Sequence, residues 1–270
     1  MTRLFVDRLT VIDCALLHPQ RGLLGESWLC DLELGGRLDA QGMVLDFAEA
    51  KRTVKQIVDA AFDHKLLVPA GHPGLSITSQ GDRDRLTLPY GEGHRVMHAG
   101  PRDAVRFLAA DTETARTVAV AIEEALRPAL PANVCDVLVT LRNEAVTGAQ
   151  YRYSHGLKQH AGNCQRIAHG HRSRIEILRD GARAPELESD WAARWRDVYI
   201  GTRSDLVETA TRHGSGVHRF RYVATQGTFE LEIPADRCYL IDSDSTVEQL
   251  AAHVACRLAA EHPGHHYRVR

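Results

Sequence analysis

The sequence has no long apolar run and no excess of charge of either sign. No window holds 18 consecutive apolar residues, so the sequence offers no ordinary membrane-spanning helix. The 33 Lys and Arg residues and 35 Asp and Glu residues leave a net charge of -2. A protein that binds nucleic acid usually carries a clear basic excess. We therefore expect neither a membrane nor a nucleic acid as a partner.

The six cysteines form no CxxC pair and are widely separated, at positions 14, 30, 135, 164, 238 and 256. In a chain of 270 residues this distribution indicates reduced thiols and not a disulfide scaffold. The N-terminal stretch MTRLFVDRLTVIDCALL carries Asp7, Arg8 and Asp13 among its apolar residues, unlike a secretory signal peptide. These features predict a cytoplasmic protein.

The order of expected elements indicates an α+β fold in two similar halves. In the first half, residues 3–13, 28–34 and 134–144 have strand character, and residues 46–64 and 112–126 have helical spacing. In the second half, we expect helices at 189–200 and 245–261 and strands at 149–157, 171–178, 218–225, 228–234, 238–241 and 266–270.

An internal duplication explains this repeated order. Residues 107–126 and 239–258 align without a gap, and both run from a strand into a helix. No Pro- or Ser-rich linker separates the halves. We therefore expect two rigidly packed units, residues 1–148 and 149–270.

The fifteen histidines call for an explanation in metal or proton chemistry. His169 and His171 lie two residues apart at the start of an expected strand, so their side chains leave the same face. His155 ends the preceding expected strand, and an antiparallel hairpin would bring the three together. Three histidines with an open fourth position are typical of catalytic zinc. The alternative is that they are loop residues in a histidine-rich chain.

Cys164 lies between these histidines in the sequence. Beside a zinc ion its thiol could act as an acid or base, because a nearby cation favours the thiolate. The alternative is a small buried apolar residue, the usual fate of a free cysteine.

The arrangement of His155, Cys164 and the HGH of residues 169–171 resembles the 6-pyruvoyltetrahydropterin synthase superfamily, which includes the 6-carboxytetrahydropterin synthases of queuosine biosynthesis. In the first half, GMVLDFAEAKRTV, FDHKLL and LRNEAVTG are similar to further family segments, and they contain Asp63, His64 and Glu144. The resemblance implies two T-fold units, each an antiparallel sheet with two helices on one face. It also implies closed barrels between subunits, and hence a homo-oligomer.

Each half lacks what the other contains. The first-half equivalents of the three histidines are expected to be Ala15, Leu24 and Glu26, and the second half has no Asp-His pair. The resemblance therefore implies one composite site per chain, which forms within one chain or between chains. Zinc is bound by His155, His169 and His171 in this interpretation.

The implied substrate is the pterin 7,8-dihydroneopterin triphosphate. Glu144 would accept hydrogen bonds from the pterin edge, and Cys164, Asp63 and His64 would move protons. Lys158 and Arg166, with His160, are candidate contacts of the triphosphate. The plainer alternatives are a solvated strand end for Glu144, a histidine at a helix C-terminus for His64, and a polar loop for the basic residues.

The spacing of four residues between Cys164 and His169 is intermediate between two branches of the family. We favour a zinc-dependent lyase that forms 6-carboxytetrahydropterin. The alternatives are a 6-pyruvoyltetrahydropterin synthase and a protein that binds pterin or zinc without catalysis.

Overall fold

The computed structural model describes residues 1–91, 93–212 and 214–270. Its helices are α1 (Phe47–Ala61), α2 (Ala115–Leu126), α3 (Pro185–Arg194) and α4 (Val247–Glu261). The first eight strands are β1 (Thr2–His18), β2 (Gly22–Gly36), β3 (Leu66–Pro69), β4 (Ser76–Gln80), β5 (Arg83–Tyr90), β6 (His94–Pro101), β7 (Val105–Leu108) and β8 (Val134–Arg142). The others are β9 (Gln150–His155), β10 (His169–Arg174), β11 (Ile177–Arg179), β12 (Ala182–Arg183), β13 (Val198–Thr202), β14 (Leu206–Arg212), β15 (Ser215–Ala224), β16 (Gly227–Pro234), β17 (Cys238–Ile241) and β18 (Tyr267–Val269).

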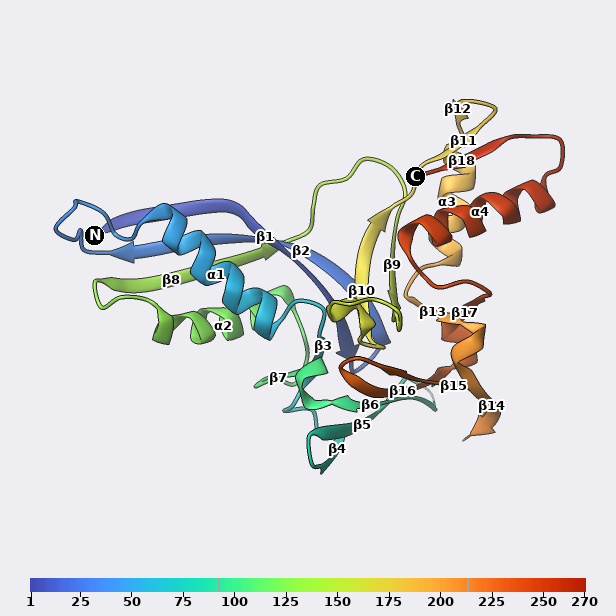
Figure 1. Ribbon diagram of the computed structural model, residues 1–270, viewed down its shortest axis with the longest axis horizontal. Coiled ribbons are helices and arrows are strands. Elements are labelled where there is room, and N and C mark those ends of the chain that lie inside the picture. The colour runs from blue at the N-terminus through green and yellow to red at the C-terminus, as the bar shows by residue number, and fades with distance from the viewer. Residues whose placement is uncertain (92, 213) are drawn as a thin grey trace.

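Two helices cover one face of a five-stranded sheet in the first half. The strand order is β7-β3-β1-β2-β8, and α1 and α2 lie beside it (Figure 1). Asp46 caps α1 by accepting a hydrogen bond from the Glu49 amide. The apolar positions of α1, Ala50, Val54 and Val58, are then fully buried against the sheet.

The second half repeats this layer with a sheet of order β10-β9-β13-β17. Trp191 of α3 and Leu250 of α4 pack with Tyr151 of β9 in one buried cluster. A small sheet of order β12-β11-β18 lies beyond it. Both large helical layers are therefore built on the same plan.

A six-stranded sheet joins the two layers, with the order β14-β15-β16-β6-β5-β4. At its centre β6 and β16 pair antiparallel, with His98 opposite Leu231. Each of these residues is the fifth of an eight-residue strand that ends in proline. The halves are thus related by a pseudo-two-fold axis at this pair.

The strand registers confirm the expected fold class of two tandem T-fold units. In the first half Leu16 pairs with Leu24, and Leu66 pairs with Val105. The corresponding pairs in the second half are His155 with His169 and Tyr199 with Cys238. The long hairpins are antiparallel, whereas β3, β7, β13 and β17 add in parallel. A boundary between the units at residue 148 remains our proposal.

Some expected boundaries were wrong. The helix expected at 189–200 begins at Pro185, since proline suits the first turn, and ends at Arg194. Residues 198–202 instead form β13, whose side chains are all buried. The alignment of residues 107–126 with 239–258 holds for the helices, since Thr114 caps α2 and Thr246 caps α4 at aligned positions. It does not hold for the preceding strands. By their pairing, β7 and β17 are equivalent in a register shifted by one residue from that alignment.

None of the helices in the described part of the chain is both long and apolar enough to cross a membrane.

His98 makes the junction between the halves sensitive to acid. Burial, assisted by the charge of Arg83, lowers its pKa from 6.5 to about 4, and its Nδ1 has no hydrogen-bond partner among the described residues. Because the folded pKa is depressed, the unfolded chain binds a proton that the folded chain excludes between these values. The contribution of His98 to stability is therefore complete above pH 6.5 and is lost as the pH is lowered toward 4.

We expect His98→Leu to remove this acid sensitivity, because the pseudo-equivalent residue is already Leu231. The variant should gain up to about 3 kcal/mol over the wild type near pH 4. Urea unfolding at pH 7 and pH 4.5 measures the effect, with exposed His262→Gln as the control. An equal loss of stability in His98→Leu and wild type on acidification would contradict the assignment.

Candidate metal centre and proton relay

Three histidines converge on the hairpin formed by β9 and β10. His155 lies directly opposite His169, and His171 lies opposite Tyr153, so all three side chains leave one face. Each offers a ring nitrogen within 4.8 Å of the others. The structure thus brings together the three residues expected to bind metal.

The Nδ1 atom of each histidine already has a neighbour. Nδ1 of His155 lies 2.8 Å from Ser245 Oγ, and Nδ1 of His169 donates to the Arg166 carbonyl at 3.0 Å. Nδ1 of His171 lies 3.4 Å from the Asp13 carboxylate. Such contacts fix the orientation of metal-binding imidazoles in many proteins.

The opposite ring nitrogens are buried without partners. Nε2 of His155 and Nε2 of His169 have no hydrogen-bond partner among the described residues. Burial lowers the pKa of both histidines well below 6.5, so both are neutral. A neutral imidazole with a free, buried lone pair is suited to bind a metal ion. Buried polar atoms are normally hydrogen-bonded, so these two unpartnered nitrogens are better explained as zinc ligands than as ordinary buried histidines.

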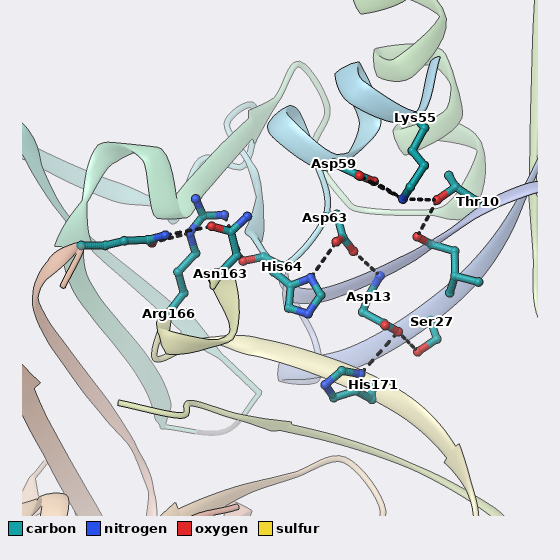
Figure 2. Close-up of polar contacts among 12 residues, drawn as sticks. Thr10, Asp13, Ser27, Lys55, Asp59, Asp63, His64, Asn163, Arg166 and His171 are labelled. Atoms are coloured by element: carbon teal, nitrogen blue, oxygen red, sulfur yellow. Dashed lines mark hydrogen bonds and ion pairs between the residues drawn. The ribbon is translucent and has the colours of Figure 1, made fainter. Parts of the chain in front are cut away.

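Asp63 and His64 reach this cluster from the other half of the same chain. His64 adopts a left-handed backbone conformation with φ 55, and its amide donates to the Asp13 carbonyl at 2.6 Å. Its Nδ1 lies 2.7 Å from Asp63, whose other carboxylate oxygen accepts from the Asp13 amide at 2.9 Å (Figure 2). The His64 ring lies 5.2 Å from the His169 ring, centre to centre. The residues expected to form the composite site therefore meet within one chain.

Cys164 completes this group from the loop between β9 and β10. Its sulfur and nitrogens of His64 and His169 lie within 4.8 Å of one another. Burial lowers the pKa of His64, but hydrogen bonds to Asp63 and Cys164 outweigh it and raise the pKa to about 10. His64 is thus charged at neutral pH and can donate a proton.

His64 does not lie at the C-terminus of a helix, which was the plainer alternative for this residue. The helix α1 ends at Ala61, and Phe62 caps it while burying its ring completely. The chain then turns at His64 into β3. The ring of His64 points to Asp63, as Figure 2 shows, and its centre lies 6.2 Å from that of the His171 ring.

Glu144 lies apart from the histidine cluster, exposed after the end of β8. It lines a pocket of about 520 Å³ together with Ser27 and Ser173. Ser27 donates a hydrogen bond to Asp13, and Ser173 follows His171 on the same face of β10. The pocket therefore adjoins the cluster through these two serines.

The basic residues expected to bind triphosphate make internal contacts instead. Arg166 is buried, and its guanidinium donates to Asp103, to Gln226 Oε1 at 3.1 Å and to the His64 carbonyl at 3.3 Å. Lys158 is paired with Asp205 and donates to Ser204 Oγ at 3.0 Å. Arg166 thus holds the His64 backbone in place, and neither residue offers a free cation.

Sequence reasoning missed Asp13 and Ser245 as partners of the histidines. Asp13 links the two halves, since it contacts His171 and also receives the backbone of His64. A charge in the apolar face of a strand was the available signal for Asp13. Nothing in the sequence marks Ser245 as a partner of His155, because serine is common just before a helix, where it usually serves as a cap.

The first-half equivalents of the metal-binding histidines can be read from the strand registers. Leu16, Leu24 and Glu26 occupy the positions of His155, His169 and His171. The expected Ala15 was wrong by one residue, because Leu16 is the residue that pairs with Leu24. Both leucines are buried in the apolar core, so this half has no metal-binding counterpart.

The sequence matches the family described as "6-pyruvoyl tetrahydropterin synthase" over residues 13–153, just over half of the chain. The chain belongs to this family. The matched range includes Asp63, His64 and Glu144 and ends two residues before His155. Family membership supports a lyase that processes a pterin. No curated protein matches the chain.

Similar solved structures are synthases of two Plasmodium species. The 6-pyruvoyltetrahydropterin synthase of Plasmodium vivax is 19% identical with a TM-score of 0.40, and covers 53% of this chain and 98% of its own. The enzyme of Plasmodium falciparum is 15% identical with a TM-score of 0.42, and covers 52% and 90%. Each thus corresponds to about half of this chain.

We expect one zinc ion per chain, lost when its ligands are removed. The His169→Ala, His171→Ala double variant should retain almost no zinc after purification, because one imidazole cannot bind zinc tightly. His160→Ala, which changes an exposed histidine of the same loop, should retain the full amount. Plasma mass spectrometry gives the content, and equal zinc in the two variants would contradict the site.

Proposed function

We propose that the chain is a zinc-dependent lyase acting on 7,8-dihydroneopterin triphosphate. The observation that carries this proposal is the pair of orphaned Nε2 atoms on His155 and His169, next to the charged His64. When bound by the three histidines, zinc would polarise an oxygen of the substrate side chain.

The protein groups around the cluster would move protons. Asp63 accepts a hydrogen bond from His64 and supports its charged form, so His64 can act as a general acid. The Cys164 sulfur lies within 4.8 Å of a His64 ring nitrogen, and Cys164 would be the partner group for a proton at the substrate carbon. Asp13 and Arg166 orient this relay through the backbone of His64.

The pterin ring would occupy the pocket lined by Glu144. A carboxylate at the pocket wall can accept two hydrogen bonds from the adjacent N–H groups of the pterin. Ser27 and Ser173 connect this pocket to Asp13 and His171, so a ligand there could place its side chain at the cluster. A pocket beside a reactive cluster suits a substrate that has a ring and a reactive side chain.

We propose 6-carboxytetrahydropterin as the product, as in queuosine biosynthesis. The family match favours a second candidate, since the matched family is described by its pyruvoyl product. Both outcomes lose triphosphate from the substrate. The pyruvoyl product then needs only internal proton transfers, whereas the carboxy product also needs one water and cleavage of the bond between the first and second side-chain carbons, which releases acetaldehyde.

We also propose that the chain acts as a cytoplasmic homo-oligomer. The strands β4 and β14 each pair on one side only among the described strands. Ile77 of β4 and Val207 of β14 are exposed apolar residues on these edges. Edge strands of this kind are usually covered, and further copies of the chain would cover them.

Incubation of the zinc-loaded protein with dihydroneopterin triphosphate, followed by product identification, tests the function. We expect acetaldehyde and 6-carboxytetrahydropterin, and a loss of at least 100-fold in kcat for Cys164→Ala because the proton relay is broken. Cys135→Ala changes an exposed cysteine and should retain full activity. Pyruvoyl pterin would establish the second candidate. No turnover by protein that binds zinc and pterin would overturn the lyase.

A further inference from the structure

The pseudo-two-fold axis creates a second composite site in each chain. At the first site, His64 has φ 55 and its amide donates to the Asp13 carbonyl. At the second, Asp197 has φ 57 and its amide donates to the Arg152 carbonyl at 2.8 Å. Asp197 and Arg152 are therefore the counterparts of His64 and Asp13.

The other residues of the second site follow from the same correspondence. Arg196 precedes Asp197 as Asp63 precedes His64. Glu26 occupies the position of His171, and Arg172 occupies that of Ser27. The contact of Asp13 with His171 at 3.4 Å is matched by an ion pair of Arg152 with Glu26 at 3.1 Å.

The exchange of residues reverses the charges. Both aspartates of the first site, Asp13 and Asp63, are replaced by arginines. The loop that carries Cys164 is replaced by a short turn between β1 and β2, from which Arg21 pairs with Asp197. The second site has therefore lost metal and proton-transfer groups and has gained guanidinium groups.

These guanidinium groups surround a pocket of about 220 Å³. It is lined by Arg21, Arg152, Arg172 and Arg196, with Asp197. Glu26 lies beneath them and pairs with Arg172 at 2.9 Å as well as with Arg152. Four guanidinium groups against two carboxylates leave two positive charges. Arg152 and Arg172 are half-buried, where water screens their repulsion poorly, whereas Arg21 and Arg196 are exposed at the mouth of the pocket.

Arg196 carries the charge that is least compensated. No described residue forms an ion pair or side-chain hydrogen bond with its guanidinium, whereas Arg21, Arg152 and Arg172 all have carboxylate partners. If these ion pairs served only to hold the two halves of the chain together, an unpaired Arg196 guanidinium at the pocket would not be needed.

We propose that this second site binds a phosphate-class anion with at least two negative charges. Guanidinium groups bind phosphate oxygens in a bidentate manner, and several arginines around one pocket can neutralise a dianion or polyanion. Gln150 and Arg172 line this pocket and also the pocket of Glu144. The anion is thus either free phosphate or the phosphate tail of a ligand whose ring lies in the larger pocket.

Titration calorimetry with inorganic pyrophosphate tests the proposal. The His169→Ala, His171→Ala background is used so that pyrophosphate cannot bind through zinc, and this makes the result independent of the proposed function. We expect binding that weakens at least 10-fold in Arg196→Ala and is unchanged in Arg37→Ala, an exposed control that directly follows β2. Acetate, a monoanion, should bind far more weakly than pyrophosphate.

Thermal melting should show that Arg196→Ala is folded, since no residue in the described part of the chain forms an ion pair with the Arg196 side chain. No pyrophosphate binding in the background protein, or equal affinity in Arg196→Ala, would overturn the proposal. In the zinc-loaded chain, pyrophosphate competition with the pterin triphosphate that is abolished by Arg196→Ala indicates the substrate tail as the source. Non-competitive behaviour that is abolished by Arg196→Ala indicates a free anion.

Discussion

The close contact between two β-hairpins at Gly25 and Gly170 is the constraint on which the site depends. A Cβ atom on Gly25 would overlap the Tyr153 carbonyl and lie 2.8 Å from the His171 backbone nitrogen, and a Cβ on Gly170 would overlap Gly25 itself. Only glycine permits backbones to approach so closely. The contact places the Ser27 hydroxyl 2.9 Å from the Arg172 amide and Asp13 beside His171. Through Asp13 it also positions Asp63 and His64, so the proton relay of one half faces the metal ligands of the other.

Two copies of one architecture have thereby diverged at two equivalent places. At one place the histidines, Cys164 and the Asp63–His64 pair come together. At the other, the metal ligands are replaced by Leu16, Leu24 and Glu26, and arginines line the pocket. The backbone geometry is retained at both, as the matching left-handed residues His64 and Asp197 show. The same hairpin contact builds both places. The backbone at the second place is therefore needed to hold the histidine site, even though the metal-binding and proton-transfer side chains are absent there.

Local sequence patterns predicted much of the fold and of the candidate site. The features that were not predicted depend on contacts between residues far apart in the sequence. The three histidines could be grouped from the sequence because side chains alternate along strands, and a hairpin brings them to one face. Asp63 and His64 were found through family resemblance, but their meeting with the histidines within one chain depends on the Gly25–Gly170 contact, which no periodicity reveals. Arg166 and Lys158 looked like free cations, since their partners Asp103 and Asp205 lie 63 and 47 residues away. Residue 198 was expected in a helix from its local spacing, but it lies in β13, because tertiary burial there outweighs helical spacing.

Complementation between two inactive variants tests most directly whether one chain builds the whole site. Chains with Cys164→Ala and chains with His64→Ala, each with its own affinity tag, are co-expressed and purified through both tags. In the structure, Cys164 and His64 of the same chain lie at one site, so every site in a mixed assembly keeps a lesion. The account predicts no more dihydroneopterin triphosphate turnover than in either variant alone. Recovery of activity in the mixed assemblies would show that the relay and the metal ligands meet between chains, and would contradict it.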